Sequence, residues 1–277
     1  MTDVSRAGEI AATLRAHIGR AVAAIGVRPG ASVAAATAVV SGLALAFPGL
    51  DIAVAGLFHH GAAGFPADRN GFLLDLRHAG MGVTRIVVVG LVVAGLAKLF
   101  VPMLARAIPS RALLFLATSM ALGPGILVNT VLKEYWGRPR PRQITEFGGT
   151  MEFFPAWVPG GACPTNCSFP SGEASSAMWL VAFAFVVPER WRRAVLVAAL
   201  GWALVISMNR IAFGAHFLSD VVVGWGLTAT IVLACRRFFL ELIGPMTATR
   251  IDDGLAWAGE RALAGMRAPF AWFGRRS

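Results

Sequence analysis

The stretch ALLFLATSMALGPGILVNTVL, residues 112–132, contains no charged side chain, and KEYWGRPRP follows it directly at residues 133–141. As an α-helix, the apolar stretch is long enough to cross the roughly 30 Å of hydrocarbon in a bilayer. Residues 29–50 also lack charge, and Lys98 is the single charge in residues 86–105. These long apolar runs predict an integral membrane protein.

Three shorter charge-free runs follow, at residues 174–188, 194–209 and 221–235. Each becomes long enough to span a bilayer when its polar flanks are included, although runs of this length also occur as buried core helices. We therefore predict an all-α bundle of about six transmembrane helices. Their expected positions are near residues 30–48, 83–105, 112–132, 171–188, 193–210 and 214–236.

The charge distribution favours a membrane protein over one that binds nucleic acid. The formal net charge is +10, yet only 14% of the residues are charged, against about 25% in a soluble domain. Short basic connections on alternate sides follow the positive-inside rule, which predicts cytoplasmic termini and outward loops at residues 49–82, 133–170 and 211–213. The basic residues concerned are Arg6, Arg15, Arg20, Arg28, Arg106, Arg111, Arg190, Arg192, Arg193, Arg236 and Arg237.

The two ends of the chain differ from the apolar centre. Residues 1–28 carry charges throughout and lack the pattern of a signal peptide, so we expect an amphipathic cytoplasmic segment there. Residues 29–237 form the predicted membrane domain, and residues 238–277 form a cytoplasmic tail. Within that tail, residues 252–273 are expected either to lie on the inner membrane surface or to form a solvated helix.

Two of the three cysteines fall in CPTNC, on the expected outward loop. An outward, oxidising location favours a disulfide between Cys163 and Cys167, with free thiols as the alternative. Cys235 lies in the last expected span and is interpreted as a small core residue.

Polar residues concentrate at three places that the topology brings to one membrane face: residues 133–141, 168–175 and 209–220. In the last of these, His216 and Asp220 are four residues apart. Asp220 is expected to accept a hydrogen bond from one imidazole nitrogen and to leave the other free to attack. A simple structural His–Asp pair at a helix end is the alternative.

Cations and a helix start complete a predicted phosphate site on the same face. Lys133, Arg140 and Arg210 need an anion, and phosphate suits their donors. Ser171 and Gly172 at a helix start would add backbone N–H groups and the positive end of the helix dipole. Two further arginines, Arg138 and Arg142, are interpreted as a rim that binds lipid headgroups. Four aromatic residues are candidates for an interfacial wall: Trp136, Phe153, Phe154 and Trp157.

The order and spacing of these residues resemble the three-part signature of the type 2 phosphatidic acid phosphatase superfamily. The matching residues are Lys133, Arg140-Pro141, Pro170-Ser171-Gly172, Arg210, His216 and Asp220. The resemblance implies a metal-independent membrane lipid phosphatase that needs no cofactor. It implies that His216 forms a phosphohistidine, that Asp220 orients it, and that Lys133, Arg140, Ser171, Gly172 and Arg210 hold the phosphoryl oxygens.

Two residues depart from the family pattern. Asn209 stands where the pattern usually has Ser, and Asn supplies similar hydrogen bonds. Glu173 stands where the pattern has the His that protonates the leaving group. Because a free Glu is ionised at neutral pH, we expect Glu173 to suit water activation better than leaving-group protonation. Alternatively, Glu173 simply stabilises a helix N-terminus.

The expected substrate is a lipid phosphate or diphosphate at the outer face of a bacterial-type inner membrane. Glu173 favours a good leaving group, and hence an isoprenoid diphosphate such as undecaprenyl diphosphate, or an anomeric lipid A phosphate, over phosphatidic acid. The alternatives are a lipid phosphotransferase with the same site and a non-catalytic phospholipid-binding or transport protein. Neither the lipid nor the oligomeric state follows from the sequence.

Overall fold

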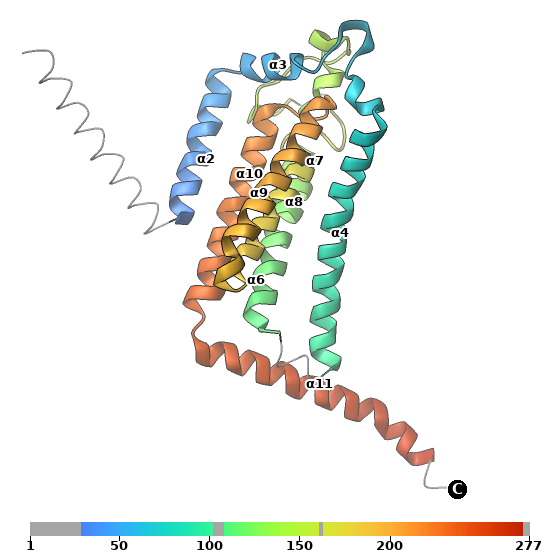
Figure 1. Ribbon diagram of the computed structural model, residues 1–277, viewed down its shortest axis with the longest axis vertical. Helices are drawn as coiled ribbons and strands as arrows, with labels where there is room; N and C mark the ends of the chain where they lie inside the picture. The colour runs from blue at the N-terminus through green and yellow to red at the C-terminus, as the bar shows by residue number, and fades with distance from the viewer. Residues whose placement is uncertain (1–28, 102–107, 161–162, 274–277) are drawn as a thin grey trace, which may run out of the picture.

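The computed structural model describes residues 29–101, 108–160 and 163–273. Its long helices run side by side, with α3 across one end of the bundle and α11 across the other (Figure 1). The α-helices are α2 (Pro29–Ala46), α3 (Gly49–Gly56), α4 (Gly71–Phe100), α6 (Ser110–Met120), α7 (Lys133–Tyr135), α8 (Gly172–Trp179), α9 (Glu189–Ala212), α10 (Leu218–Arg236) and α11 (Pro245–Phe273). Two π-helical segments are η3 (Ala121–Leu132) and η7 (Arg237–Leu242). The 3₁₀ turns are η1 (Gly61–Ala63), η2 (Pro66–Arg69), η4 (Pro141–Gln143), η5 (Thr145–Phe147) and η6 (Leu180–Phe185).

Five helical stretches within the described ranges are long and apolar enough to cross a membrane, which confirms an all-α membrane fold. They are Pro29–Ala46, Gly71–Lys98, Ser110–Tyr135, Glu189–Ala212 and Leu218–Leu242. The described ranges contain no β-strand, and an isolated bridge joins Ile144 to Met151. The amphipathic segment expected at residues 1–28 lies outside the described residues.

The span expected at residues 171–188 is a shorter, interior helix. Helix α8 continues into the turn η6, and the two end at Phe185. Helix α8 packs against α9, α10 and η3, and its small residues Ala174, Ser175 and Ala177 are buried. A helix enclosed by other helices does not have to match the bilayer thickness, so its short length is compatible with its place.

Helix α4 begins at Gly71, well before residue 83, where we expected the span to start. The side chain of Asn70 accepts a hydrogen bond from the N–H of Leu73 at 3.1 Å and so caps the helix N-terminus. Polar residues in the first turns, among them Asp75 and Arg77, lower the hydropathy there. The start of the helix therefore cannot be recognised from the apolar run alone. The longer helix brings Arg77 to the end of the bundle where the motif residues lie.

The third span continues through Pro124, which has no N–H group and would break an ordinary α-helix. Residues 121–132 are π-helical instead, a form that accommodates local interruptions of the hydrogen-bond ladder. The side-chain amide of Asn129 donates a hydrogen bond of 2.6 Å to the carbonyl oxygen of Pro124. This segment carries Lys133 to the end of the span.

The apolar core lies between α6, α8, α9 and α10. Trp179 is fully buried among Phe115, Leu116 and Val232, and its indole N–H donates to the hydroxyl of Ser119 at 3.0 Å. Cys235 is buried in the same cluster with a free thiol, as expected of a small core residue.

Helix α11 is tied to the opposite end of the bundle from the motif residues. Asp252 Oδ1 lies 2.9 Å from Lys98 Nζ and accepts a hydrogen bond of 3.0 Å from the backbone N–H of Ser110. A carboxylate at the N-terminus of α6 is also stabilised by the helix dipole. The expected tail helix at residues 252–273 is therefore part of a longer helix that holds α4 and α6 together at their ends.

Candidate active site

The predicted site residues come from separate elements that end at one face of the bundle (Figure 1). Their positions are Lys133 at the start of α7, Arg140 before η4, Ser171, Gly172 and Glu173 at the start of α8, Arg210 in the last turn of α9, His216 in the connection to α10, and Asp220 in the first turn of α10. The sequence prediction that these three motifs converge therefore agrees with the fold.

His216 is 1% exposed, and its Nδ1 atom lies 2.7 Å from the carbonyl oxygen of Ser168. A carbonyl oxygen only accepts hydrogen bonds, so Nδ1 must carry the proton and Nε2 must present a lone pair. Burial lowers the pKa of His216 to about 4, helped by the positive charge of Lys133. The imidazole is therefore neutral at neutral pH, which is the form that a nucleophile requires.

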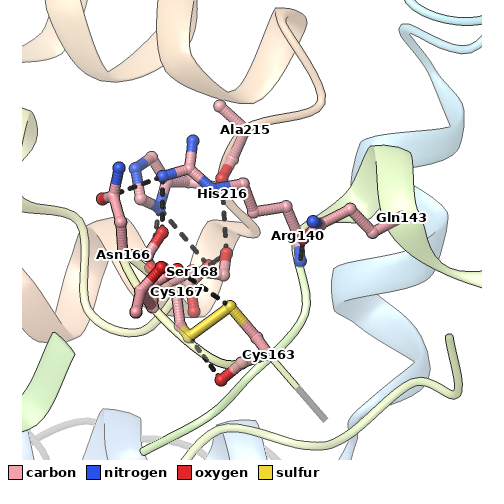
Figure 2. The surroundings of a disulfide bond; sticks show 10 residues. Arg140, Gln143, Cys163, Asn166, Cys167, Ser168, Ala215 and His216 are labelled. Atoms are coloured by element: carbon pink, nitrogen blue, oxygen red, sulfur yellow. Dashed lines mark hydrogen bonds and ion pairs between the residues drawn. A yellow bond between two sulfur atoms is a disulfide. The ribbon is translucent and has the colours of Figure 1, made fainter. Parts of the chain in front are cut away.

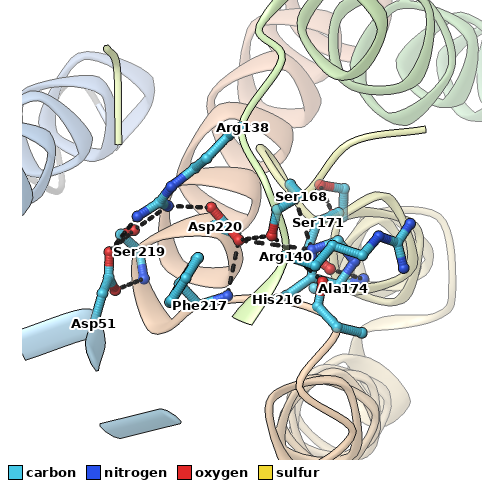
Figure 3. A network of polar contacts seen from close by, with 12 residues as sticks. Asp51, Arg138, Arg140, Ser168, Ser171, Ala174, His216, Phe217, Ser219 and Asp220 are labelled. Carbon is cyan, nitrogen blue, oxygen red and sulfur yellow. Dashed lines mark hydrogen bonds and ion pairs between the residues drawn. The ribbon is translucent and has the colours of Figure 1, made fainter. Parts of the chain in front are cut away.

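The predicted direct hydrogen bond from His216 to Asp220 is replaced by an indirect connection. Asp220 Oδ2 lies 3.7 Å from Nδ1, beyond hydrogen-bonding distance. It accepts instead from the hydroxyl of Ser168 at 2.5 Å and from the backbone N–H of Phe217 at 2.8 Å. Asp220 thus holds Ser168, whose carbonyl orients His216 (Figure 3).

Arg138 is fully buried at the centre of a polar network, so its interpretation as part of a headgroup-binding rim was wrong. Its guanidinium pairs with Asp220 and, at 2.8 Å, with Asp51 of α3. The same group donates to the hydroxyl of Ser219 at 2.9 Å and to the carbonyl oxygen of Phe154 at 2.8 Å. Figure 3 shows this bridge between α3 and α10. The other proposed rim residue, Arg142, is exposed.

A disulfide joins Cys163 to Cys167, as the outward location predicted. The loop that it closes contains Asn166, whose backbone and side-chain oxygens accept hydrogen bonds from Arg140 Nη2 at 2.8 and 3.1 Å (Figure 2). The residue after the loop is Ser168, the partner of His216. The disulfide loop therefore constrains the position of Arg140 and the orientation of His216 together.

The start of α8 is more tightly packed than the sequence suggested. The backbone N–H of Ser171 donates to the carbonyl oxygen of Asp220 at 3.0 Å, so it is not free to bind phosphate. The hydroxyl of Ser171 caps the helix by accepting from the N–H of Ala174 at 3.4 Å. A Cβ atom on Gly172 would lie 2.1 Å from Asn129 Oδ1. Gly172 is thus required for contact between α8 and η3.

Arg210 offers buried donors that nothing in the described part of the chain satisfies. Its side chain is 2% exposed, and both Nε and Nη1 lack a hydrogen-bond partner there. The nearest anion is Glu173, whose Oε2 lies 3.4 Å from Arg210 Nε. Buried unsatisfied donors on a cation are costly, and a bound anion would satisfy them.

Arg77 of α4 is a site residue that sequence reasoning missed. Its Nε donates to Glu173 Oε1 at 3.3 Å, so the Glu173 carboxylate lies between two guanidinium groups. A cavity of about 240 Å³ opens beside Glu173 and Lys133 and extends along α4 to Thr84 and Arg85. A charged residue such as Arg85 inside a span is itself an indication of a functional cavity.

The aromatic residues expected to form an outward wall pack against one another instead. Trp136 and Trp157 lie with ring centroids 5.5 Å apart, and both contact the ring of Phe169. Phe153 packs against Phe217 at 5.3 Å. These rings belong to two small clusters, one around Phe169 and one around Phe217, the residue that follows His216.

Within the described ranges, no three His, Cys, Asp or Glu side chains are grouped so that they could hold a metal ion. Independence from metal remains a prediction from the sequence.

Comparisons with known proteins identify the family that the chain resembles. The family model of the PAP2 superfamily matches residues 112–243. The chain is 46% identical over 123 residues to a lipid A 4'-phosphatase of Rhizobium leguminosarum, which covers 44% of this chain and 52% of that protein. A lipid A 4'-phosphatase of Francisella tularensis subsp. novicida is 35% identical over 180 residues, covering 64% of this chain and 81% of that protein.

Two further comparisons concern substrate position and fold. A lipid A 1-phosphatase of Rhizobium etli is 32% identical over 123 residues, covering 42% of this chain and 48% of that protein. The crystal structure of a transmembrane PAP2 type phosphatidylglycerolphosphate phosphatase from Bacillus subtilis aligns with a TM-score of 0.52 and 19% identity, covering 78% of this chain and 98% of that one. The chain spans about half the length of the rhizobial relatives that it matches.

Proposed function

The chain belongs to the PAP2 superfamily, and on that premise we propose that it is a membrane phosphatase that removes the 4'-phosphate of lipid A or of a closely related lipid. The observation that carries the proposal is the pair of unsatisfied, buried Arg210 donors near a neutral, oriented His216. An anion with several oxygens would satisfy these donors together with those of Lys133 and Arg140.

In the proposed reaction, Nε2 of His216 attacks phosphorus while the bond from phosphorus to the sugar oxygen breaks. The departing sugar oxygen takes a proton from solvent water, so the products of this step are a phosphohistidine and the lipid with a free hydroxyl. Water then attacks phosphorus, releases inorganic phosphate and restores the imidazole. Lys133, Arg140 and Arg210 stabilise the charge on the phosphoryl oxygens in both transition states, where most of the catalysis of phosphoryl transfer lies.

Glu173 is the proposed base that activates water in the second step. Its carboxylate is held between Arg77 and Arg210 and lines the cavity beside Lys133, where water can reach it. A 4'-phosphate is an ester of an ordinary sugar hydroxyl, whose oxygen is a poorer leaving group than a diphosphate or an anomeric oxygen. From the sequence, Glu173 favoured substrates with a good leaving group, namely a diphosphate or an anomeric phosphate. We propose the 4'-phosphate instead because of the relatives that are named lipid A 4'-phosphatase.

We further propose that the site faces the periplasm from a bacterial-type inner membrane. The disulfide at the site end and the arginines at the opposite ends of the spans both support this orientation. A cysteine introduced at Glu152 should react with an impermeant thiol reagent in intact cells, and one introduced at Arg192 should not. The opposite labelling would place the site in the cytoplasm.

Phosphate release by the purified protein tests the reaction directly. The substrates are lipid A carrying either the 4'-phosphate alone or the 1-phosphate alone, undecaprenyl diphosphate and phosphatidic acid, each in the same detergent. We expect the highest kcat/KM with the 4'-monophosphate, no turnover in His216→Ala, and a slower but measurable rate in Asp220→Asn. Faster release from the 1-phosphate or from the diphosphate would refute the proposed substrate, and an active His216→Ala protein would refute the mechanism.

A further inference from the structure

The Glu173 carboxylate has two unequal cationic partners. Arg77 Nε makes a hydrogen bond to Oε1 at 3.3 Å, whereas the contact of Oε2 with Arg210 Nε at 3.4 Å is an ion pair without a hydrogen bond. The side chain of Arg77 is 34% exposed and that of Arg210 is 2% exposed. Arg77 is thus the partner that makes a hydrogen bond to the carboxylate, and it is also more exposed to solvent than Arg210.

A phosphate bound by Arg210 would bring a second anion against Glu173. Two anions that share one guanidinium repel each other, and the repulsion is strong because the side chain of Arg210 and its surroundings are buried. Arg210 is packed in place, with its guanidinium 5.1 Å from the centre of the Phe213 ring. Arg210 therefore stays in place when the phosphate binds, and the negative charge of Glu173 then needs another cation as its partner.

Arg77 is placed to be that partner. It comes from α4, a helix that contributes none of the motif residues but that lines the cavity beside Lys133 with Gly80, Thr84 and Arg85. Arg77 donates its hydrogen bond to Oε1 of Glu173, whereas the oxygen that faces Arg210 is Oε2. The contact with Arg77 can therefore persist while a phosphate replaces Glu173 as the partner of Arg210.

We propose that Arg77 is a positioning residue for Glu173: it holds the carboxylate at the edge of the site so that Arg210 is released to the substrate phosphate. Glu173 and Arg210 form a closed pair in the empty site, and Arg77 keeps Glu173 when that pair opens. This inference rests on the proposed phosphatase reaction, and it assigns to α4 a role in admitting the phosphate.

A double-mutant cycle between Arg77→Met and Glu173→Gln tests the proposal. The measurements are the rate of the first chemical step, followed as the burst of dephosphorylated lipid that precedes the hydrolysis assigned to Glu173, and the inhibition constant of inorganic phosphate. We expect Arg77→Met alone to slow this burst and to weaken phosphate binding by about 30-fold each. In the Glu173→Gln background, the same substitution should cost no more than about threefold, and the ratio of about tenfold between the two backgrounds is a coupling within the usual range for contacting residues.

Two further variants separate a charge effect from a loss of structure. Arg77→Lys keeps the charge and should retain most of the activity, while Arg69→Met removes an exposed arginine near the start of α4 and should behave like the wild type. Equal losses from Arg77→Met in both backgrounds would overturn the proposal, and so would equal losses in Arg77→Lys and Arg77→Met. If the wild type releases no phosphate, or if His216→Ala is active, the proposed function itself fails.

Discussion

Replacing Arg138 with methionine would leave two buried carboxylates without their shared cation. Asp51 and Asp220 are 4% and 0% exposed, and Arg138 pairs with both. Asp220 would keep its hydrogen bonds from Ser168 and Phe217. Removal of one partner from a buried ion pair typically costs about 3–5 kcal/mol. We therefore expect Arg138→Met to lower the free energy of unfolding by about that amount.

The same substitution should slow catalysis through the chain of contacts from Arg138 to His216. When Asp220 moves, Ser168 loses its hydroxyl partner and its carbonyl no longer fixes Nδ1 of His216. A misplacement of about 1 Å at a reacting group can reduce the rate by about 100-fold. We expect a reduction of kcat of that order, with a smaller change in KM because Arg138 does not face the cavity.

Unfolding of the purified protein in detergent, followed together with phosphate release, measures both effects. Asp51→Asn removes one of the two carboxylates, so the double variant with Arg138→Met should recover part of the lost stability. Arg142→Met is the matched control, because it removes an exposed arginine from the same loop. If Arg138→Met is as stable and as active as Arg142→Met, the account of this network is wrong.

Three other expectations concern the nucleophile, the disulfide and the far end of the bundle. The folded-state pKa of His216 is about 4 and its unfolded value about 6.5, so the unfolded state binds the proton first as the pH falls. The wild type should lose about 3 kcal/mol of stability between pH 6.5 and pH 4; a His216→Ala protein with the same pH dependence would contradict this. Replacing Cys163 and Cys167 together by serine should reduce kcat about tenfold, whereas Cys235→Ala should leave it unchanged. Equal values of kcat in the wild type and in both variants would count against a role for the disulfide loop. Asp252→Ala removes the acceptor of the Ser110 N–H at the start of α6 and one of the partners of the buried Lys98. The free energy of unfolding should therefore fall by about 1–2 kcal/mol while the rate of phosphate release stays unchanged; a loss of activity at full stability would contradict this separation.

The sequence was sufficient for the parts of the site that depend on the identity and spacing of side chains. The apolar runs predicted the spans, and the positive-inside pattern brought Lys133, Arg140, Arg210 and His216 to one face. Residue spacing along a helix placed Asp220 next to His216, although the direct partner proved to be a backbone carbonyl. Because every residue has such a carbonyl, no signal in the sequence marks the one at Ser168.

The supporting residues were harder to predict because their partners lie far away along the chain. Asp51 and Arg138 are separated by 87 positions, and Arg77 and Glu173 by 96. A signal was present in both cases. Asp51 is a charge directly after the apolar run of residues 29–50, and Arg77 is a charge in the polar turns that precede another run. A charge at the edge of a span indicates a partner, but composition alone does not say which one.

The position of α3 and α4 in the chain has a consequence for how much of the protein the site requires. Asp51 and Arg77 both precede residue 112, where the match to the family model begins, yet Asp51 pairs with Arg138 and Arg77 pairs with Glu173. A fragment limited to residues 112–243 would therefore lack both the carboxylate that pairs with Arg138 and the guanidinium that pairs with Glu173. The stretch that matches the family is thus not sufficient by itself to hold these two side chains in the arrangement described.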